Sequence, residues 1–133
     1  MRKYLPLVAV MPLALFACSG QSEHPAAVSV YFPTGSAQLN AEGRQAVASA
    51  ARDFQRANVN AVEVEGHADS VGSSAYNLTL ATERAQAVTQ QLAADGVPAD
   101  RITIRAVGES EPAVSTPSGA PEPQNRRAVI QFD

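Results

Sequence analysis

Apolar and polar residues alternate in four short segments of this chain, which is the pattern of β-strands that bury one face. The segments are residues 28–32, a stretch within residues 60–69, residues 101–108 and residues 126–132. The apolar positions that share one side of each strand are Val28, Val30 and Phe32; Val62 and Val64; Ile102, Ile104 and Ala106; and Ala128, Ile130 and Phe132. The chain is therefore expected to form a sheet of four strands.

Two longer segments repeat their apolar residues at the spacing of amphipathic helices. The first starts after Asn40, a favourable N-cap, and ends near Asn58. The second runs from Tyr76 to Asp95, and Gly96 is a natural stop after it. The apolar stripes are Ala46, Val47, Ala50 and Phe54 in the first helix and Leu80, Ala81, Ala85, Val88 and Leu92 in the second.

The elements follow one another as β-α-β-α-β-loop-β, and the loop at residues 108–124 is rich in Pro, Ser and Gly. Strands that alternate with helices favour crossover connections with the helices on one face of the sheet. We therefore predict an α+β fold, a two-layer β-α-β-α-β-β sandwich with a mixed four-stranded sheet. A single domain is expected over residues 28–133.

The first 17 residues have the features of a secretory signal. Arg2 and Lys3 precede an apolar run, residues 4–16, that is too short to span a bilayer. Cys18 follows Leu-Phe-Ala and resembles the acylated cysteine of a bacterial lipobox; the alternative is an ordinary signal peptide with a chance cysteine. We expect lipidation at Cys18 and a short tether over residues 18–27.

Composition narrows the classes of partner. Cys18 is the only cysteine among 133 residues, so an intrachain disulfide is excluded. The formal charge of −3 becomes −5 if Arg2 and Lys3 leave with the signal. An acidic chain argues against nucleic acid or anionic lipid as the main partner. His24 is expected to be a solvated residue of the tether.

A cluster of polar residues follows the second predicted strand. His67, Asp69 and Ser70 include the residue types of a hydrolase triad, but a triad draws its members from separated elements. Two ligands, His67 and Asp69, are also too few for a metal site. The sequence therefore predicts no enzyme activity, no cofactor and no metal, and a hydrogen-bonded structural role for His67.

Asp69 and Arg84 suit a different role. A carboxylate accepts hydrogen bonds from an ammonium, and a guanidinium offers a planar fork to a carboxylate. Together they complement a zwitterion that bears both groups on one carbon. The spacing alone leaves open a second interpretation, in which the two side chains form only a surface ion pair with each other.

The sequence also resembles a known family. The stretch "VEGHADSVGSSAYNLTLATERAQAVTQQL" is similar to the central motif of the OmpA-like peptidoglycan-binding domain, usually written GH-T-D-x-x-G-x-x-x-Y-N-x-x-L-S-x-x-R-A. "DGVPADRITIRAVGESEP" and "NRRAVIQF" resemble its later motifs in the same order. The resemblance covers about residues 28–133. With the lipobox, the chain is similar to the peptidoglycan-associated lipoprotein type.

The resemblance implies a β-α-β-α-β-β fold and non-covalent binding to the diaminopimelate of the wall peptide. By motif, Asp69 would take the ligand ammonium and Arg84 the carboxylate. The remaining motif positions would line or support the pocket: Asn77, Leu80, Asn125 and Arg127, with Arg126 as an alternative to Arg127.

Three departures from the family pattern occur. Ala68 stands where the family usually has Thr, and Ala81 where it usually has Ser, so two hydroxyl groups near the pocket are missing. The loop at residues 33–39 lacks the acid or Asn often found before its serine, and residues 114–123 are short and Pro-rich. These changes leave both charged anchors in place but could weaken the affinity.

The expected function is a non-catalytic tether. Its lipid would lie in the outer membrane of a Gram-negative bacterium, and its domain would face the periplasm and hold the diaminopimelate of peptidoglycan. The alternative is a lipoprotein subunit of an envelope-spanning secretion or motility complex that uses the same fold mainly for contact with envelope proteins.

Overall fold

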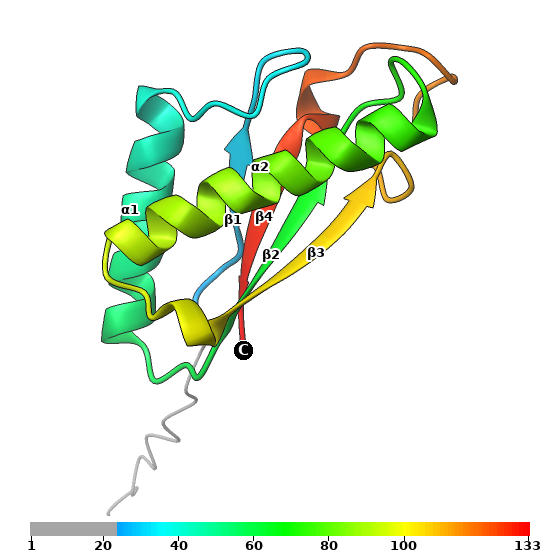
Figure 1. The fold of residues 1–133 in the computed structure, drawn as a ribbon. Helices are drawn as coiled ribbons and strands as arrows, with labels where there is room; N and C mark the ends of the chain where they lie inside the picture. The colour runs from blue at the N-terminus through cyan, green and yellow to red at the C-terminus, as the bar shows by residue number, and fades with distance from the viewer. Residues whose placement is uncertain (1–23) are drawn as a thin grey trace, which may run out of the picture.

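The computed structural model describes residues 24–133 (Figure 1). Its elements are β1 (Val28–Tyr31), α1 (Ala41–Arg56), β2 (Val62–His67), α2 (Ser74–Ala94), β3 (Ile102–Gly108) and β4 (Arg127–Phe132). Two single-turn 3-10 helices, η1 (Ala99–Arg101) and η2 (Pro123–Asn125), precede β3 and β4. The predicted signal peptide, Cys18 and the first part of the tether lie outside the described residues.

The four strands form one mixed sheet in the order β1-β4-β2-β3. β2 and β3 are parallel and are connected through α2, while β4 runs antiparallel to both β1 and β2. The helices lie on one face of this sheet (Figure 1). The predicted α+β sandwich is confirmed.

The hydrophobic core lies between the sheet and the helices. Its buried members come from the predicted faces of both layers: Val30, Val62, Val64, Ala128 and Ile130 from the sheet, and Val47, Ala50, Ala85, Val88 and Leu92 from the helices. Burial of each larger aliphatic side chain contributes about 1.5–3 kcal/mol to stability. The apolar positions predicted from the sequence therefore match the buried residues of the core for most of the chain.

Side chains define where both helices begin. Oδ1 of Asn40 accepts a hydrogen bond from the Gly43 amide at 2.7 Å, as predicted for an N-cap. In the second helix Oγ of Ser73 accepts from the Tyr76 amide at 3.1 Å, so α2 begins at Ser74, two residues before the predicted start. The serine cap was missed because Ser73 and Ser74 end a polar stretch that lacks the apolar spacing of a helix.

β2 and α2 approach each other closely at Gly66. A Cβ placed there would lie 1.9 Å from the carbonyl oxygen of Ala81. Ala81 is fully buried in this contact, so this departure from the family pattern lies at the helix–sheet interface. Ala68 is also buried, but it lines a hollow together with Ser70 and Glu109.

β3 differs from the sequence prediction. Ile104 was expected to share one side of the strand with Ile102 and Ala106, yet it is 43% exposed. β3 is an edge strand with only β2 beside it, so the outer part of its apolar row lacks a neighbour.

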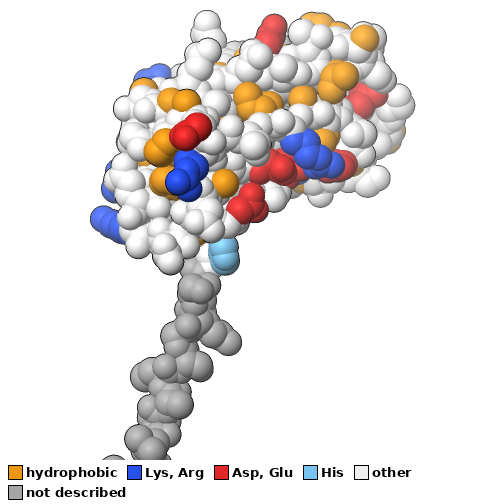
Figure 2. Space-filling model, turned by 60° about the horizontal axis from the view of Figure 1, so that its bottom comes forward, with side chains coloured by type: hydrophobic (Ala, Val, Ile, Leu, Met, Phe, Trp, Pro, Cys, Tyr) orange, Lys and Arg blue, Asp and Glu red, His pale blue; other side chains and the backbone are white. Residues whose placement is uncertain are grey.

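A buried carboxylate lies on the sheet face opposite the helices. Glu65 of β2 pairs with Arg105 of β3 and accepts a hydrogen bond from Gln131 of β4. Arg105 also pairs with Glu111 at 2.6 Å, and this contact raises the pKa of Arg105 and lowers that of Glu111. On the face shown in Figure 2, basic side chains likewise lie beside acidic ones.

The two ends of the sheet differ in what they carry. The N-terminal segment enters β1 at the same end as the C-terminus, whereas the loops after β1, β2 and β3 gather at the opposite end (Figure 1). Within residues 24–133, no helix is both long and apolar enough to cross a membrane.

Candidate functional site

Asp69 lies in the loop that follows β2, at the end of the sheet where the loops gather. The pairing of β2 with β3 is irregular between Gly66 and His67, and the Ala68 amide then donates to the Gly108 carbonyl at 2.9 Å. This bond holds the chain beside β3 for one more residue. The Asp69 side chain is thereby fixed just past the strand end.

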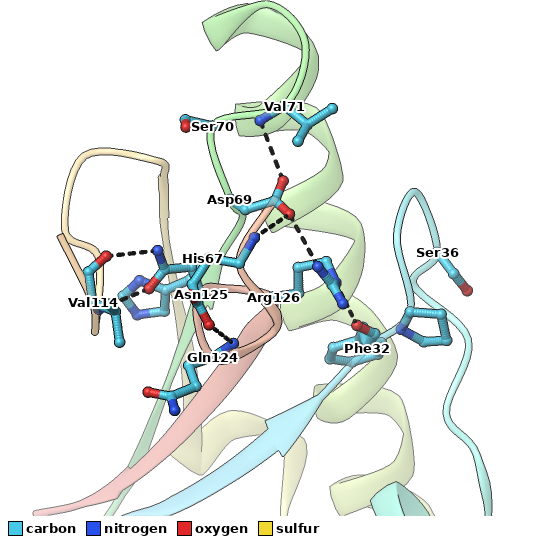
Figure 3. Close-up of polar contacts among 12 residues, drawn as sticks. Phe32, Ser36, His67, Asp69, Ser70, Val71, Val114, Gln124, Asn125 and Arg126 are labelled. Carbon is cyan, nitrogen blue, oxygen red and sulfur yellow. Dashed lines mark hydrogen bonds and ion pairs between the residues drawn. The ribbon is translucent and has the colours of Figure 1, made fainter. Parts of the chain in front are cut away.

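The carboxylate of Asp69 is buried and has three partners (Figure 3). Oδ1 accepts from the Val71 amide at 3.3 Å. Oδ2 accepts from the Glu122 amide at 3.3 Å and from Nη1 of Arg126 at 3.2 Å, and the latter contact is an ion pair. Asp69 therefore binds residues from the connection between β3 and β4.

Arg84 lies on α2 with its side chain completely removed from solvent. Its three nitrogen atoms donate to the carbonyls of Ser36 (2.9 Å), His67 (3.0 Å) and Pro33 (3.1 Å). The guanidinium carbon also lies 5.4 Å from the centre of the Phe32 ring, a distance typical of a cation–π contact. Arg84 thus joins the loop after β1 to the end of β2.

Burial lowers the pKa of Arg84 to about 10, and the positive charge of Arg126 acts in the same direction. The negative charge of Asp69 opposes this shift. Arg84 therefore remains protonated at neutral pH.

The structure places Asp69 and Arg84 close enough for their charges to interact, but the ion pair of Asp69 is made with Arg126. The interpretation of Asp69 and Arg84 as a mutual surface pair is wrong, because both side chains are buried and each has other partners. Burial of two opposite charges at one end of the fold remains the main feature of the site.

The four expected supporting residues lie in different surroundings. Asn77 and Leu80 are buried on α2, and Nδ2 of Asn77 donates to Glu109 at 3.0 Å. Asn125 is buried and makes two hydrogen bonds with the backbone of Val114, at 2.8 and 2.9 Å. Arg127 begins β4 and lies close enough to His67 to influence its pKa.

The connection between β3 and β4 covers Asp69. Oγ of Ser70 donates to the Pro117 carbonyl at 3.3 Å and accepts from the Gly119 amide at 3.0 Å. Glu122 and Arg126 add their contacts with Asp69. We call residues 117–126 the covering segment. The sequence predicted a loop here, but its Pro and Gly residues gave no sign of which side chains it would bind.

His67 is buried and its Nδ1 lies 3.1 Å from the Glu111 carbonyl oxygen, while its Nε2 has no hydrogen-bond partner in the structure. The predicted hydrogen-bonded role of His67 is confirmed. Burial lowers its pKa, and the nearby charge of Arg127 lowers it further. Ser70 and Asp69 bind the covering segment and not His67, so these three side chains do not form the relay of a hydrolase triad.

A hollow of about 240 Å³ opens between the connection from β3 to β4 and two residues, Ala68 and Ser70, that flank Asp69 in the chain. Hydroxyl groups and the carboxylate of Glu109 contribute to its lining. Across the described part of the chain, no three His, Cys, Asp or Glu side chains come together in a way that could hold a metal ion. The polar residues that line this hollow suit polar recognition.

Comparison with known protein families matches residues 31–126 to the OmpA family model. The chain belongs to the OmpA family. The match includes all the loops that form the site and both α-helices.

One protein with a similar sequence is a lipoprotein. The chain is 37% identical over 100 residues to the peptidoglycan-associated lipoprotein of Agrobacterium fabrum, which is 75% of this chain and 56% of that protein. The chain thus spans little more than half the length of this relative.

Two solved structures have the same fold. One is the peptidoglycan-associated lipoprotein of Burkholderia pseudomallei, with a TM-score of 0.72 and 27% identity over 80% of this chain and 90% of that chain. The other is the cell wall anchor of the T6SS of Pseudomonas aeruginosa, with a TM-score of 0.66 and 26% identity over 80% and 79% of the two chains.

Proposed function

We propose that this protein is a non-catalytic tether that binds peptidoglycan through the diaminopimelate of the stem peptide. The observation that carries this proposal is the meeting of a buried carboxylate, Asp69, and two guanidinium groups, Arg84 and Arg126, at one end of the fold. Family membership and the peptidoglycan-associated lipoproteins among its relatives support the same ligand.

The chemistry of the ligand matches that of the site. The free end of diaminopimelate bears an ammonium and a carboxylate on one carbon. Asp69 would accept the ammonium. Arg84 is enclosed in the free protein and would have to be uncovered to hold the carboxylate with the two of its five N–H groups that the three carbonyls leave over. Each such charge-assisted bond contributes about 1.5–3 kcal/mol.

The other expected residues would shape the pocket. Asn77 and Leu80 brace α2 below the site, and Asn125 fixes the base of the covering segment. Arg127 would act through His67, beside which it lies.

The membrane part of the proposal rests on the sequence. A lipid on Cys18 would anchor the chain in the outer membrane, facing the periplasm, and the lipoprotein among its relatives supports a lipid anchor. The end at which the N-terminal segment enters β1 lies opposite the site (Figure 1). An anchor at one end and a wall-binding site at the other suit a protein that joins two layers.

Co-sedimentation with purified sacculi of the diaminopimelate type tests this proposal. We expect residues 19–133 to pellet with the sacculi and Asp69→Asn to lower the apparent affinity about tenfold or more, because the amide cannot pair with an ammonium as a carboxylate does. Asp53→Asn on α1 is the matched control, since it makes the same chemical change away from the site. Circular dichroism verifies that each variant is folded.

A second variant addresses the guanidinium. Arg84→Lys keeps the charge but places all its donors on one nitrogen, which cannot match the spread of Nε, Nη1 and Nη2 over three separate carbonyls, so we expect weaker pelleting together with a lower melting temperature. Wild-type protein that stays in the supernatant would contradict the proposal, and so would an Asp69→Asn variant that pellets like Asp53→Asn.

The alternative function is that of a subunit in an envelope-spanning complex. The observation that favours it is the structural match to the T6SS cell wall anchor. Affinity purification from membranes would separate the two functions. A stable complex that persists in Asp69→Asn would favour protein contact as the main role. An Asp69→Asn variant that loses both the complex and its binding to sacculi would favour the tether.

A further inference from the structure

The ion pair between Asp69 and Arg126 bears directly on how a ligand could bind. Oδ2 of Asp69 already accepts from Nη1 of Arg126 at 3.2 Å and from the Glu122 amide (Figure 3). The Asp69 side chain is only 7% exposed. A ligand ammonium therefore cannot reach this oxygen from solvent until one of the two donors leaves.

Both donors bond Oδ2 of Asp69 at long distances, 3.3 Å for the Glu122 amide and 3.2 Å for Arg126, but the amide is fixed in the backbone and the guanidinium ends a flexible side chain. Arg126 makes its bonds to Asp69 and to the Phe32 carbonyl at 3.2 Å each. Charge-assisted N–H···O bonds are usually about 2.7–2.9 Å long, so both are long for such bonds. The bonds between Asn125 and Val114 are 2.8 and 2.9 Å, so the neighbouring residue is held more closely.

Exposure points to the same residue. The Arg126 side chain is 14% exposed, whereas Arg84 is fully enclosed and bonded to three carbonyls. Arg126 can therefore turn toward water by changing its side-chain torsions alone. Release of Arg84 would require the loop after β1 to separate from β2, since Arg84 joins them.

We propose that Arg126 is an intramolecular competitor for Asp69, which the ligand ammonium displaces; this inference rests on the proposed function. In the free protein the guanidinium occupies the position of the ligand cation and keeps the buried carboxylate paired. On binding, one cation replaces another, and Asp69 is never left as an uncompensated buried charge.

This exchange makes Arg126 a specificity-determining residue. A neutral or anionic peptide that displaced Arg126 would leave the carboxylate of Asp69 without its ion-pair partner, which is unfavourable for a buried charge. Only a ligand that brings its own cation can open the site at low cost. The apparent affinity for the ligand equals the affinity of the open site multiplied by the fraction of molecules in which Arg126 has left Asp69.

Calorimetric titration with the soluble stem tripeptide that ends in meso-diaminopimelate tests the proposal. Residues 19–133 are compared with Arg126→Gln, which cannot compete, and Arg126→Lys, which keeps the charge. We expect Arg126→Gln to bind about tenfold more tightly than wild type and Arg126→Lys to remain close to wild type. Arg52→Gln removes the same charge from an exposed position on α1 and should bind like wild type.

The outcomes separate this inference from the proposed function. If wild type binds and Arg126→Gln binds more weakly or equally, Arg126 is not a competitor, although the tether function stands. If Arg126→Gln binds and wild type does not, Arg126 blocks the site, so the inference holds while the proposed function of the wild-type chain fails. If neither binds the tripeptide, the proposed function fails and this inference fails with it.

A second measurement uses only the wild-type chain and so does not depend on how a variant folds. The Nε proton of Arg126 donates to the Phe32 carbonyl and should exchange slowly with water in the free protein. Saturation with the tripeptide should speed its exchange at least tenfold, as followed by nitrogen-15 NMR. Exchange that stays unchanged while the tripeptide binds would overturn the proposal.

Discussion

A guanidinium that is removed from water must replace its lost hydration with hydrogen bonds. Arg84 does so with carbonyls from Pro33, Ser36 and His67, which belong to two segments far apart in the sequence. Arg84 therefore organises the end of the fold whether or not a ligand is present. A binding role and a structural role meet in this one side chain, which is why its variants need a measurement of folding beside each measurement of affinity.

His67 gives a prediction about pH. Burial and Arg127 lower its pKa below 6.5, although Glu65 and Glu111 act in the opposite direction. The unfolded chain then takes up a proton at a higher pH than the folded protein, so the free energy of unfolding falls as the pH drops below about 7 toward the folded pKa. We expect the melting temperature of His67→Gln to depend less on pH than that of wild type between pH 7 and about 5.

The other shifted carboxyl group near His67, that of Glu111, affects stability in a different pH range. Its pKa is lowered by Arg105, so its effect on stability appears only below its ordinary value of 4.5. A melting profile with the same slope between pH 7 and 5 in wild type and His67→Gln would contradict the assignment to His67.

Sequence reasoning found the residues of the site more readily than their contacts. Asp69 was recognisable because an acid at the exit of a strand lies where loops gather, and Arg84 through its place in the motif. Arg126 appeared only as an alternative to Arg127, since neighbouring residues on a strand differ in the face they occupy and two adjacent arginines look alike. The position of the covering segment decides between them, and no local pattern encodes it.

At the scale of elements, the contact between β2 and α2 depends on Gly66. Any larger residue would place its Cβ against the Ala81 carbonyl, at 1.9 Å in the present geometry. Helix and strand must then separate, and we expect Gly66→Ala to lower the free energy of unfolding by about 3 kcal/mol or more. Urea denaturation measures this change.

Gly119→Ala is a suitable control for that substitution. Gly119 has a φ of 80° and open space around its Cβ position. Alanine there should lower the free energy of unfolding only through the strain of the left-handed backbone, by about 1–2 kcal/mol. If the two variants lose similar stability, the close approach at Gly66 does not limit the packing of β2 against α2.

The elements were predictable where periodicity and caps agree. α1 has an apolar stripe and the Asn40 cap, and its start was predicted correctly. β3 was harder, because alternation alone does not tell an edge strand from a central one, and Ile104 is half exposed for that reason. The short helices η1 and η2 carry no periodic signal, so residues 123 and 124 were assigned to a loop.

At the scale of the whole molecule, the site faces away from the end where the N-terminal segment enters (Figure 1). A tether of nine residues, 19–27, spans at most ~30 Å. An anchored domain would therefore stay near the membrane with its loops turned outward. We expect attachment to a bilayer to leave the binding site accessible.

Coupling through the only cysteine tests this arrangement. Residues 18–133 can be joined at Cys18 to vesicles that carry a maleimide lipid, and their affinity for the stem tripeptide compared with that of the free domain. We expect the two affinities to agree within about twofold. A tenfold loss on the vesicles would mean that the bilayer covers the site, contrary to the orientation in the structure.

The pairing of β1 with β4 has a mechanical consequence. A pull between a membrane anchor and a wall ligand would enter at Val28 and run along β1, which pairs antiparallel with β4 over Val28–Tyr31. β4 in turn follows directly from Arg126 in the chain. Because this force runs parallel to the strands, the hydrogen bonds between β1 and β4 would share the load together in shear and would not open one after another. A four-residue strand placed in this way can resist a force that would unzip the same strand from its end.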